Sequence, residues 1–144
     1  MKQIRYSEAL REALREALKA DPRVLLLGED IGVYGGAFGV TRGLLAEFGP
    51  DRVRNTPISE TSVVGAAVGA ALTGSRPVVE IMFMDFVTLA LDPMVNLAAK
   101  ARYVYGPDAA CPLVLRTAAG GGKGYGPTHS QTLEAWFLHV PGVK

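Results

Sequence analysis

The chain has 144 residues, of which 49% are hydrophobic and 20% are charged, which is enough for one domain with an apolar core. Fifteen basic residues face fourteen acidic ones, giving a formal charge of +1. Because no lysine or arginine cluster stands out, the composition argues against nucleic acid or an anionic membrane as the partner.

The cysteine count and the first residues bear on the compartment. Cys111 is the only cysteine, so an internal disulfide is impossible, and the polar residues 1–5 lack the apolar core of a signal peptide. The longest apolar helix candidate has about a dozen residues, well short of the roughly 20 that span a bilayer. We therefore expect a soluble chain, without membrane association, in a reducing, cytoplasmic setting.

The chain begins with a predicted helix and a buried strand. Residues 7–20 place leucine and alanine on one stripe and charged residues on the other side, which is typical of an amphipathic helix. The apolar residues 24–27 predict a strand that is covered on both faces and that Gly28 stops. Glu29 and Asp30 follow at the carboxyl end of this strand, where ligands gather in open α/β sheets, so this acidic pair is a functional candidate. Simple solvation of the two carboxylates is the alternative.

A loop, a short helix and a second strand come next. Residues 32–43 hold five glycines and predict a loop, and residues 44–48 predict a short helix that a Gly-Pro pair ends. Residues 52–55 predict a brief strand. Residues 61–73 are almost all apolar or small, and they predict a helix that is buried on most of its circumference.

The junction before this helix contains Glu60. Pro57 disfavours helix at the residue before it, and Ser59 is expected to cap the helix with its hydroxyl. Glu60 then falls in the first turn, where a negative charge suits the helix dipole. Helix stability and a catalytic role are both explanations for this carboxylate. Further along the helix, Gly65 and Gly69 predict close packing against a neighbouring element or subunit.

The second half of the chain repeats the alternation of strand and helix. Residues 78–81 predict a strand, and residues 85–104 have largely helical spacing that Pro93 breaks or kinks. Phe86 lies near the start of this segment, just past the strand. Residues 112–116 predict a further strand, and a glycine-rich loop follows it.

That loop, residues 117–127, holds five glycines but matches neither common phosphate-binding motif. Lys123 is followed by glycine and not by serine or threonine, and the glycine spacing does not give G-x-G-x-x-G. His129 follows the loop and precedes a predicted helix at residues 133–139. A histidine at the carboxyl end of a strand is a catalytic candidate, and a structural or merely exposed histidine is the alternative.

The order of these elements predicts the fold class. Strand, loop and helix alternate four times, which favours an α/β domain with a doubly wound, mainly parallel sheet and helices on both faces. No internal repeat or low-complexity linker divides the chain, so a single domain is expected.

Ordered blocks of sequence add a family resemblance. They are Leu27-Gly28-Glu29-Asp30, Thr56-Pro57-Ile58-Ser59-Glu60, Arg76-Pro77-Val78-Val79-Glu80, Phe83-Met84-Asp85-Phe86, Asn96-Leu97-Ala98-Ala99-Lys100, His129-Ser130-Gln131, Glu134-Ala135-Trp136-Phe137 and Pro141-Gly142-Val143-Lys144. Together they resemble the beta chain of the thiamine-diphosphate-dependent 2-oxo acid dehydrogenase component, in its N-terminal pyrimidine-binding domain of the transketolase-like fold. A full beta chain of that family continues into a second domain, so residues 1–144 are expected to be a truncated form.

The resemblance implies roles for four residues. Glu60 would hydrogen-bond the aminopyrimidine ring of thiamine diphosphate and relay a proton, so that the imino tautomer forms and then the ylide that attacks a substrate carbonyl. Phe86 would pack against the pyrimidine, Glu29 would line the same cleft, and His129 would lie near the substrate and the acyl intermediate. Leu89 is a departure, because some members of the family have a polar amide there.

The resemblance also implies the reaction and the partners. The chain would be the beta subunit of a 2-oxo acid or acetoin dehydrogenase component that passes an acyl group to a lipoyl carrier. Its partners would be an alpha chain, in an alpha2beta2 assembly that holds magnesium mainly on the alpha chain, and a lipoyl-bearing acyltransferase core. No metal site is expected in this chain itself, and the isolated chain is expected to be inactive.

Two questions stay open at this point. Pyruvate, branched-chain 2-oxo acids and acetoin are all possible substrates, although residues 80–86 and 134–137 look closer to acetoin dehydrogenase beta chains. The alternative function is a non-catalytic α/β binding or subunit-assembly domain, in which Glu60 only stabilises the start of a helix.

Overall fold

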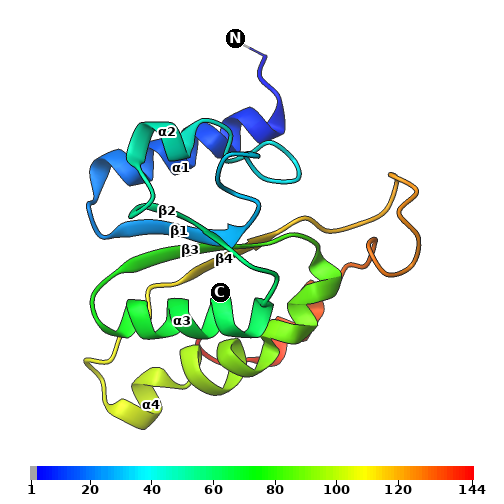
Figure 1. Cartoon of the computed structure of the whole chain (residues 1–144). Coiled ribbons are helices and arrows are strands. Elements are labelled where there is room, and N and C mark those ends of the chain that lie inside the picture. The colour runs from blue at the N-terminus through cyan, green and yellow to red at the C-terminus, as the bar shows by residue number, and fades with distance from the viewer. Residues whose placement is uncertain (1–2) are drawn as a thin grey trace.

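A parallel sheet is the centre of the molecule (Figure 1). The computed structural model describes residues 3–144, so Met1 and Lys2, which belong to the polar start considered above, lie outside the described residues. The sheet has four strands in the order β2-β1-β3-β4 and every neighbouring pair is parallel, which confirms the predicted sheet. The strands are β1 (Val24–Glu29), β2 (Val53–Thr56), β3 (Arg76–Ile81) and β4 (Val114–Thr117).

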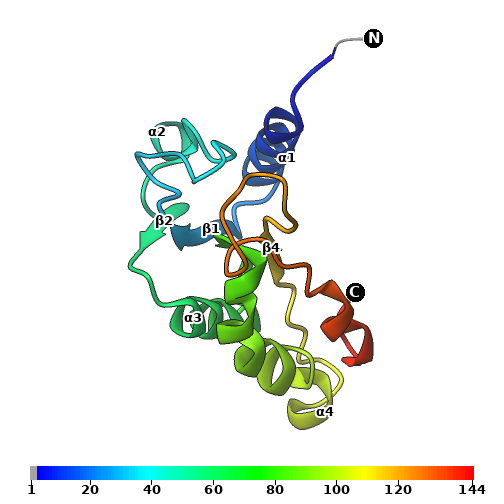
Figure 2. The same ribbon diagram turned by 90° about the vertical axis from the view of Figure 1, so that its right-hand side faces the viewer.

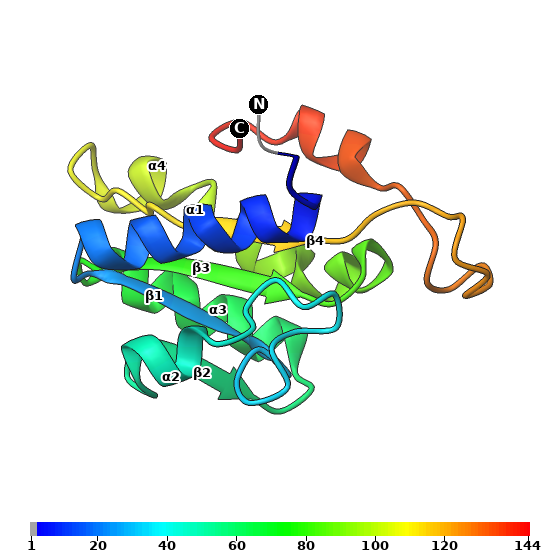
Figure 3. The ribbon, with the colours of Figure 1, turned by 90° about the horizontal axis from the view of Figure 1, so that it is seen from above.

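Helices cover both faces of this sheet, as expected for a doubly wound fold (Figures 1 and 3). On one face lie α1 (Tyr6–Ala20) and α2 (Leu44–Phe48). On the other lie α3 (Glu60–Leu72), the short helical segments η1 (Met84–Ala90) and η2 (Pro93–Ala98), and α4 (Ala101–Tyr105). The last segment, η3 (Glu134–His139), lies on the β4 side. No helix within residues 3–144 is both long and apolar enough to cross a membrane.

The core has two halves because successive side chains of a strand point to opposite faces. Leu26 of β1 belongs to the cluster under α1 and α2, and Leu27 belongs to the cluster under α3. The first cluster comprises Leu18, Val24, Leu26, Ile31, Leu44 and Val53. The second comprises Leu27, Val63, Val64, Ala67, Val79, Ile81, Ala90 and Met94. A strand buried on both sides reads as a continuous apolar run, which is why residues 24–27 predicted β1.

Gly28 does not stop β1, contrary to the prediction. The strand continues through Gly28, which pairs with Glu80 of β3, to Glu29, which pairs with Thr56 of β2. A Cβ atom at Gly28 would lie 2.8 Å from the Glu80 carbonyl oxygen, so this glycine permits a close approach of the two backbones. Glu29 is therefore the last residue of the strand and its position is fixed by the sheet.

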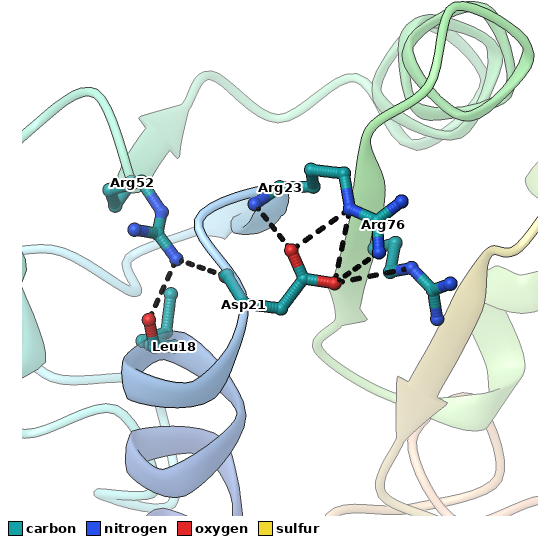
Figure 4. Close-up of polar contacts among 5 residues, drawn as sticks. All are labelled: Leu18, Asp21, Arg23, Arg52 and Arg76. Atoms are coloured by element: carbon teal, nitrogen blue, oxygen red, sulfur yellow. Dashed lines mark hydrogen bonds and ion pairs between the residues drawn. The ribbon is translucent and has the colours of Figure 1, made fainter.

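Polar contacts join the elements at the amino edge of the sheet, the end where its strands begin (Figure 4). The Arg52 guanidinium donates to the carbonyls of Leu18 and Asp21, each at 2.9 Å, and so satisfies groups at the end of α1. The Asp21 carboxylate accepts hydrogen bonds from Arg23 and lies 3.3 Å from Arg76 Nε at the start of β3. The hydrogen bonds from Arg23 lower the pKa of Asp21 to about 2. These contacts connect the end of α1 with the starts of β1, β2 and β3.

Helix α3 is buried on one side only, so the prediction that most of its circumference is covered is wrong. Its buried side consists of Val63, Val64, Ala67, Val68 and Ala71. The side that contains Ala66 and Gly69 is exposed, and a Cβ atom placed on Gly65 or Gly69 would meet no atom within 4 Å. No element of residues 3–144 packs against these two glycines, so the predicted close packing is not made within the described residues.

The segment after β3 is broken, as Pro93 predicted. Instead of one helix it consists of η1, η2 and α4, with Pro93 as the first residue of η2. Proline has no amide hydrogen and its ring crowds the preceding turn, so the regular α-helical hydrogen-bond pattern is interrupted at this position. Leu91 and Asp92 keep helical backbone angles at the break, and η1 remains next to the carboxyl end of β3.

Candidate active site

All four predicted site residues lie at the end of the sheet where its parallel strands finish. This end is called the carboxyl edge below. Glu29 ends β1, Glu60 begins the helix after β2, Phe86 belongs to η1 after β3, and His129 belongs to the loop after β4. Parallel strands place these ends together, and Figure 2 views the molecule from this edge with the glycine-rich loop in orange. The chain moves from β1 outward to β2 and then returns to β3 on the other side of β1. Ligands bind at such a switch point in open α/β sheets.

Glu29 and Glu60 form a carboxylate pair on the β1–β2 side of this edge. Both side chains are half-buried. Desolvation raises the pKa of Glu29, and the negative charges of Asp30 and Glu60 raise it further. Burial and the nearby negative charges therefore disfavour the ionised form of Glu29 at this position.

The start of α3 positions Glu60, though not by the predicted cap. The Ser59 hydroxyl donates to the Pro57 carbonyl at 3.2 Å and makes no cap bond, so the expectation of a Ser59 side-chain cap is wrong. The Ser59 carbonyl instead accepts the first helical hydrogen bond, from the Val63 N–H at 2.9 Å. Glu60 is thus the first residue of the helix, next to the positive end of its dipole.

A side-chain hydrogen bond joins the first turn of α3 to η1. The Thr61 hydroxyl donates to the Leu89 carbonyl at 2.5 Å. Because η1 contains Phe86, this bond holds the turn of Glu60 beside the segment of the predicted aromatic. Leu89 therefore contributes its backbone at this position, and its side chain is 50% exposed.

Phe86 and His129 meet in an aromatic cluster whose centre is Phe83. The Phe86 and His129 rings are 5.2 Å apart and nearly perpendicular, at 86°. Phe83 lies 4.9 Å from His129, 6.2 Å from Phe86, and 5.7 Å from both Phe38 and Tyr125, measured between ring centroids. Edge-to-face pairs at such distances are attractive. The cluster brings Phe86 and His129 together across the β3–β4 side of the edge.

Sequence reasoning missed Phe83 as a site residue, although a signal was present. Phe83 lies two residues beyond the end of β3 and three before Phe86. Any residue at that distance from a strand end lies at the ligand-binding edge of the sheet. Phe83 entered only as part of the block Phe83-Met84-Asp85-Phe86, and the spatial arrangement shows that its neighbours are other rings.

Residues after β3 also fix both ends of the glycine-rich loop. The Met84 N–H donates to the Ala118 carbonyl at 2.8 Å. The Asp85 carboxylate accepts from Gln131, at 2.8 Å from the side-chain amide and 3.3 Å from the backbone N–H. Burial acts to raise the pKa of Asp85, but the hydrogen bonds from Gln131 and backbone groups outweigh it and the pKa is lowered. His129 therefore lies two residues before Gln131, which the Asp85 contact holds in place.

Two hollows among the described residues lie beside α1. A small void between α1 and the sheet is lined by residues that include Leu26, Thr41 and the buried ion pair of Glu80 with Arg116. A groove along the outer side of α1 is lined by polar residues such as Arg11 and Arg15. Neither hollow contains the four predicted residues. Within residues 3–144, no group of three or more His, Cys, Asp or Glu side chains could hold a metal ion.

Comparisons with known proteins show a consistent set of similarities. Residues 2–144 match the family described as "Transketolase, pyrimidine binding domain". The chain is 46% identical over 143 residues to the rice (Oryza sativa subsp. japonica) protein named pyruvate dehydrogenase E1 component subunit beta-2, mitochondrial, which covers 99% of this chain and 38% of that protein. It is 46% identical over 142 residues to the pyruvate dehydrogenase E1 component subunit beta of Rickettsia felis, covering 99% of this chain and 44% of that one.

A solved structure shows the same architecture. It is described as "Split gene transketolase, inactive beta4 tetramer" and has a TM-score of 0.63 at 25% sequence identity, over 93% of this chain and 39% of that one. In each of these comparisons the chain spans less than half the length of the relative. The similarity therefore concerns one part of longer proteins.

The names of the relatives correct the expected compartment. Proteins from rice and Arabidopsis thaliana with this similarity are named as mitochondrial, so the expectation of a cytoplasmic setting is not supported. The expectation rested on a single cysteine and a polar start. The absence of disulfides indicates at most a reducing environment, and more than one compartment provides that.

Proposed function

This chain belongs to the transketolase pyrimidine-binding domain family, and from that premise we propose that it binds and activates thiamine diphosphate as part of a 2-oxo acid dehydrogenase beta subunit. The observation that supports this most is the position of Glu60. It begins the helix that follows β2 at the carboxyl edge of the sheet, its charge contributes to the raised pKa of Glu29, and it lies on a turn bonded to the segment of Phe86. The names of the relatives support the choice of reaction.

The residues at this edge fit an aminopyrimidine ring. Such a ring needs a carboxyl group at a ring nitrogen and a flat apolar surface against its face. Glu60 provides the first and Phe86 provides the second, each from an element anchored to the sheet. The raised pKa of Glu29 shows that negative charge is already disfavoured in this region, which favours a proton shared with a neutral heterocycle.

Each residue would have a distinct part in the reaction. When bound, thiamine diphosphate supplies a nucleophilic carbon that adds to a substrate carbonyl. Glu60 holds a proton at its carboxyl group and exchanges it with a ring nitrogen. Phe86 excludes water from one face of the site. The Nδ1 of His129 is 3.0 Å from the Thr128 hydroxyl, which leaves Nε2 to exchange a proton with the substrate.

The partners and the substrate belong to the same proposal. The relatives are named as the beta subunit of an E1 component, which supports an alpha chain as the partner, with magnesium held mainly there, and a lipoyl-bearing acyltransferase as the acceptor. The uncovered side of α3 supports a second subunit. The names also make pyruvate the first substrate to test, before branched-chain 2-oxo acids and acetoin.

Glu60→Gln in the enzyme assembled with its alpha chain tests the role of this carboxylate. We expect turnover of the 2-oxo acid to fall by at least about 100-fold, because the amide cannot exchange the proton. The free energy of unfolding should change by under about 1 kcal/mol, since a first-turn charge contributes little to helix stability. Glu8→Gln in α1 is the matched control, because Glu8 is also an acid in a first helical turn, and it should leave turnover unchanged.

The same variants separate this function from the alternative, a non-catalytic subunit-assembly domain. The uncovered side of α3 favours an assembly role. If Glu60→Gln keeps near-normal turnover with the cofactor bound, Glu60 is only a helix-start carboxylate and the proton-relay role is wrong.

A further inference from the structure

Phe83 is the one ring that contacts every other member of the aromatic cluster. It forms edge-to-face pairs with Phe38, Phe86, Tyr125 and His129. It is half-buried and belongs to neither apolar cluster of the core. Its environment is therefore the carboxyl edge of the sheet and not the interior, so filling the core is not its role.

The backbone around Phe83 is rigid, whereas most of its partners come from loops. The Met84 N–H, one residue on, donates to the Ala118 carbonyl at 2.8 Å, and the Phe83 carbonyl accepts from the Phe86 N–H at 3.0 Å. Tyr125 and His129 lie in a loop in which Gly120, Gly122, Gly124 and Gly126 have positive φ angles between 74° and 92°. A loop of this composition has wide backbone freedom. Side-chain contacts must then restrict where its histidine lies.

We propose that Phe83 is a positioning residue for His129, holding the imidazole against Phe86 and linking its position to the glycine-rich loop through Tyr125. The centroid distance from His129 is shorter to Phe83, at 4.9 Å, than to Phe86, at 5.2 Å. The Thr128 hydroxyl at Nδ1 comes from the adjacent residue of the same loop, so it cannot fix the imidazole relative to the sheet. Phe83, which follows β3 closely, can fix the imidazole relative to the sheet. The catalytic meaning of this position rests on the proposed function of His129.

The test is the proton NMR spectrum of the imidazoles in the full 144-residue chain. The chain has two histidines, and His139→Gln assigns the two C2–H signals. In the wild type, the ring currents of two perpendicular neighbours should displace the His129 signal from the position of an isolated imidazole. Phe83→Leu removes one ring current and moves that signal in any case, so the deciding readout is the nuclear Overhauser effect between the ring protons of His129 and Phe86. It should weaken in Phe83→Leu and should be kept in Phe83→Tyr.

Two further variants control for a general loss of packing. Phe48→Leu makes the same substitution at a residue packed against the core under α1 and α2, and it should leave the His129 signal and the Overhauser effect unchanged. Tyr125→Ala removes a ring that is 52% exposed, so it should not unfold the chain, and it should move the His129 signal by a smaller amount. An unchanged Overhauser effect between His129 and Phe86 in Phe83→Leu, or an equal loss of it in Phe48→Leu, overturns the positioning role.

Activity of the assembled enzyme separates this inference from the function on which it rests. Misplacement of a reacting group by about 1 Å can lower turnover by about 100-fold, so Phe83→Leu should reduce turnover while Phe83→Tyr restores it. If the Overhauser effect weakens as expected but His129→Ala keeps full turnover, Phe83 still positions His129 and the proposed function of that histidine is wrong.

Discussion

Glu29, at the carboxyl edge of the sheet, is a carboxylate whose surroundings disfavour its negative charge. Desolvation and the charges of Asp30 and Glu60 raise its pKa above 4.5. A carboxyl group with a raised pKa stabilises the fold only while it is protonated. This contribution is complete below the unfolded pKa, near 4.5, and it is lost as the pH rises through the folded pKa. At neutral pH the ionised form of Glu29 thus opposes folding.

Glu29→Gln should accordingly stabilise the chain at pH 7. We expect the free energy of unfolding to rise by under about 1 kcal/mol, because Glu29 is only partly shielded from water. The advantage should disappear near pH 4, where the wild-type carboxyl group is protonated as well. Urea titrations at the two pH values measure both effects. Glu16→Gln, at an exposed position of α1, is the control, and a loss of stability in Glu29→Gln at pH 7 would contradict the electrostatic account.

At the scale of elements, the segment after β3 organises the loop after β4. Met84 binds the start of that loop and Asp85 binds its end, 2.8 Å from the Gln131 side-chain nitrogen. Each contact joins residues far apart in the chain and lies at the same edge of the sheet. The loop is therefore an exposed segment with fixed ends, in which His129 lies close to one of them.

Asp85→Ala should release the end of this loop. Lys123 is the only lysine or arginine between Arg116 and Lys144, so trypsin cleavage after Lys123 gives one diagnostic pair of fragments. We expect cleavage at this bond to be several-fold faster in the variant, while the rest of the chain stays resistant. Asp92→Ala removes a hydrogen bond to Asn96 on the neighbouring segment and is the control, for which no acceleration at Lys123 is expected.

The wild type should show the same loosening in acid. The lowered pKa of Asp85 means that its contribution is present above the ordinary value of 3.8 and is lost as the pH falls through the folded pKa. Amide hydrogen exchange of residues 118–131, corrected for the intrinsic rate and followed from pH 5 downward until the chain unfolds, measures this change. Protection of these residues that is lost no earlier than that of the β-strands would show that the Asp85 contact does not hold the loop.

Substitutions in helix α3 distinguish an effect on folding from an effect on assembly. Gly65 and Gly69 have open space where a Cβ atom would be, so each glycine is unfavourable for the isolated chain. Gly65→Ala and Gly69→Ala should each raise its free energy of unfolding by about 0.5–1 kcal/mol. If a second subunit packs closely there, the same variants should weaken assembly with the alpha chain. Ultracentrifugation of the mixed subunits measures this, and unaltered assembly would remove the interface role of these glycines.

At the scale of the whole molecule, the two edges of the sheet differ in kind. The amino edge is closed by Asp21, Arg23, Arg52 and Arg76, which bind groups of the same chain. The carboxyl edge instead presents half-buried acids and rings, beside a helix with one bare side. One edge stabilises the fold and the other is suited to a ligand and a second chain.

The isolated chain should therefore neither catalyse the reaction nor bind the cofactor tightly. It offers one carboxyl group and one aromatic face for the pyrimidine, whereas the magnesium that binds the diphosphate is expected mainly on the alpha chain. The uncovered apolar surface, which includes Leu72 at 38% exposure, should lead to self-association. Calorimetry with magnesium and thiamine diphosphate, together with ultracentrifugation, measures both properties. Micromolar binding by a monomer would contradict a site shared between chains.

The sequence by itself determined the elements, the fold class and the family. Apolar runs such as residues 24–27 predicted buried strands, and Pro93 predicted the break after β3, because periodicity and proline geometry act over a few residues. The alternation of strand and helix then restricted the topology, since parallel strands need crossover connections. The positions of Glu29, Glu60, Phe86 and His129 after their strands followed from the same local order.

Only the tertiary structure decided how these residues are combined. The central position of Phe83, the bond from Thr61 to Leu89 and the contact of Asp85 with Gln131 join segments up to 46 residues apart. The expected stop at Gly28 was wrong because this residue pairs with Glu80 of a neighbouring strand. Such contacts depend on three-dimensional packing, which the order of residues along one strand or helix does not contain.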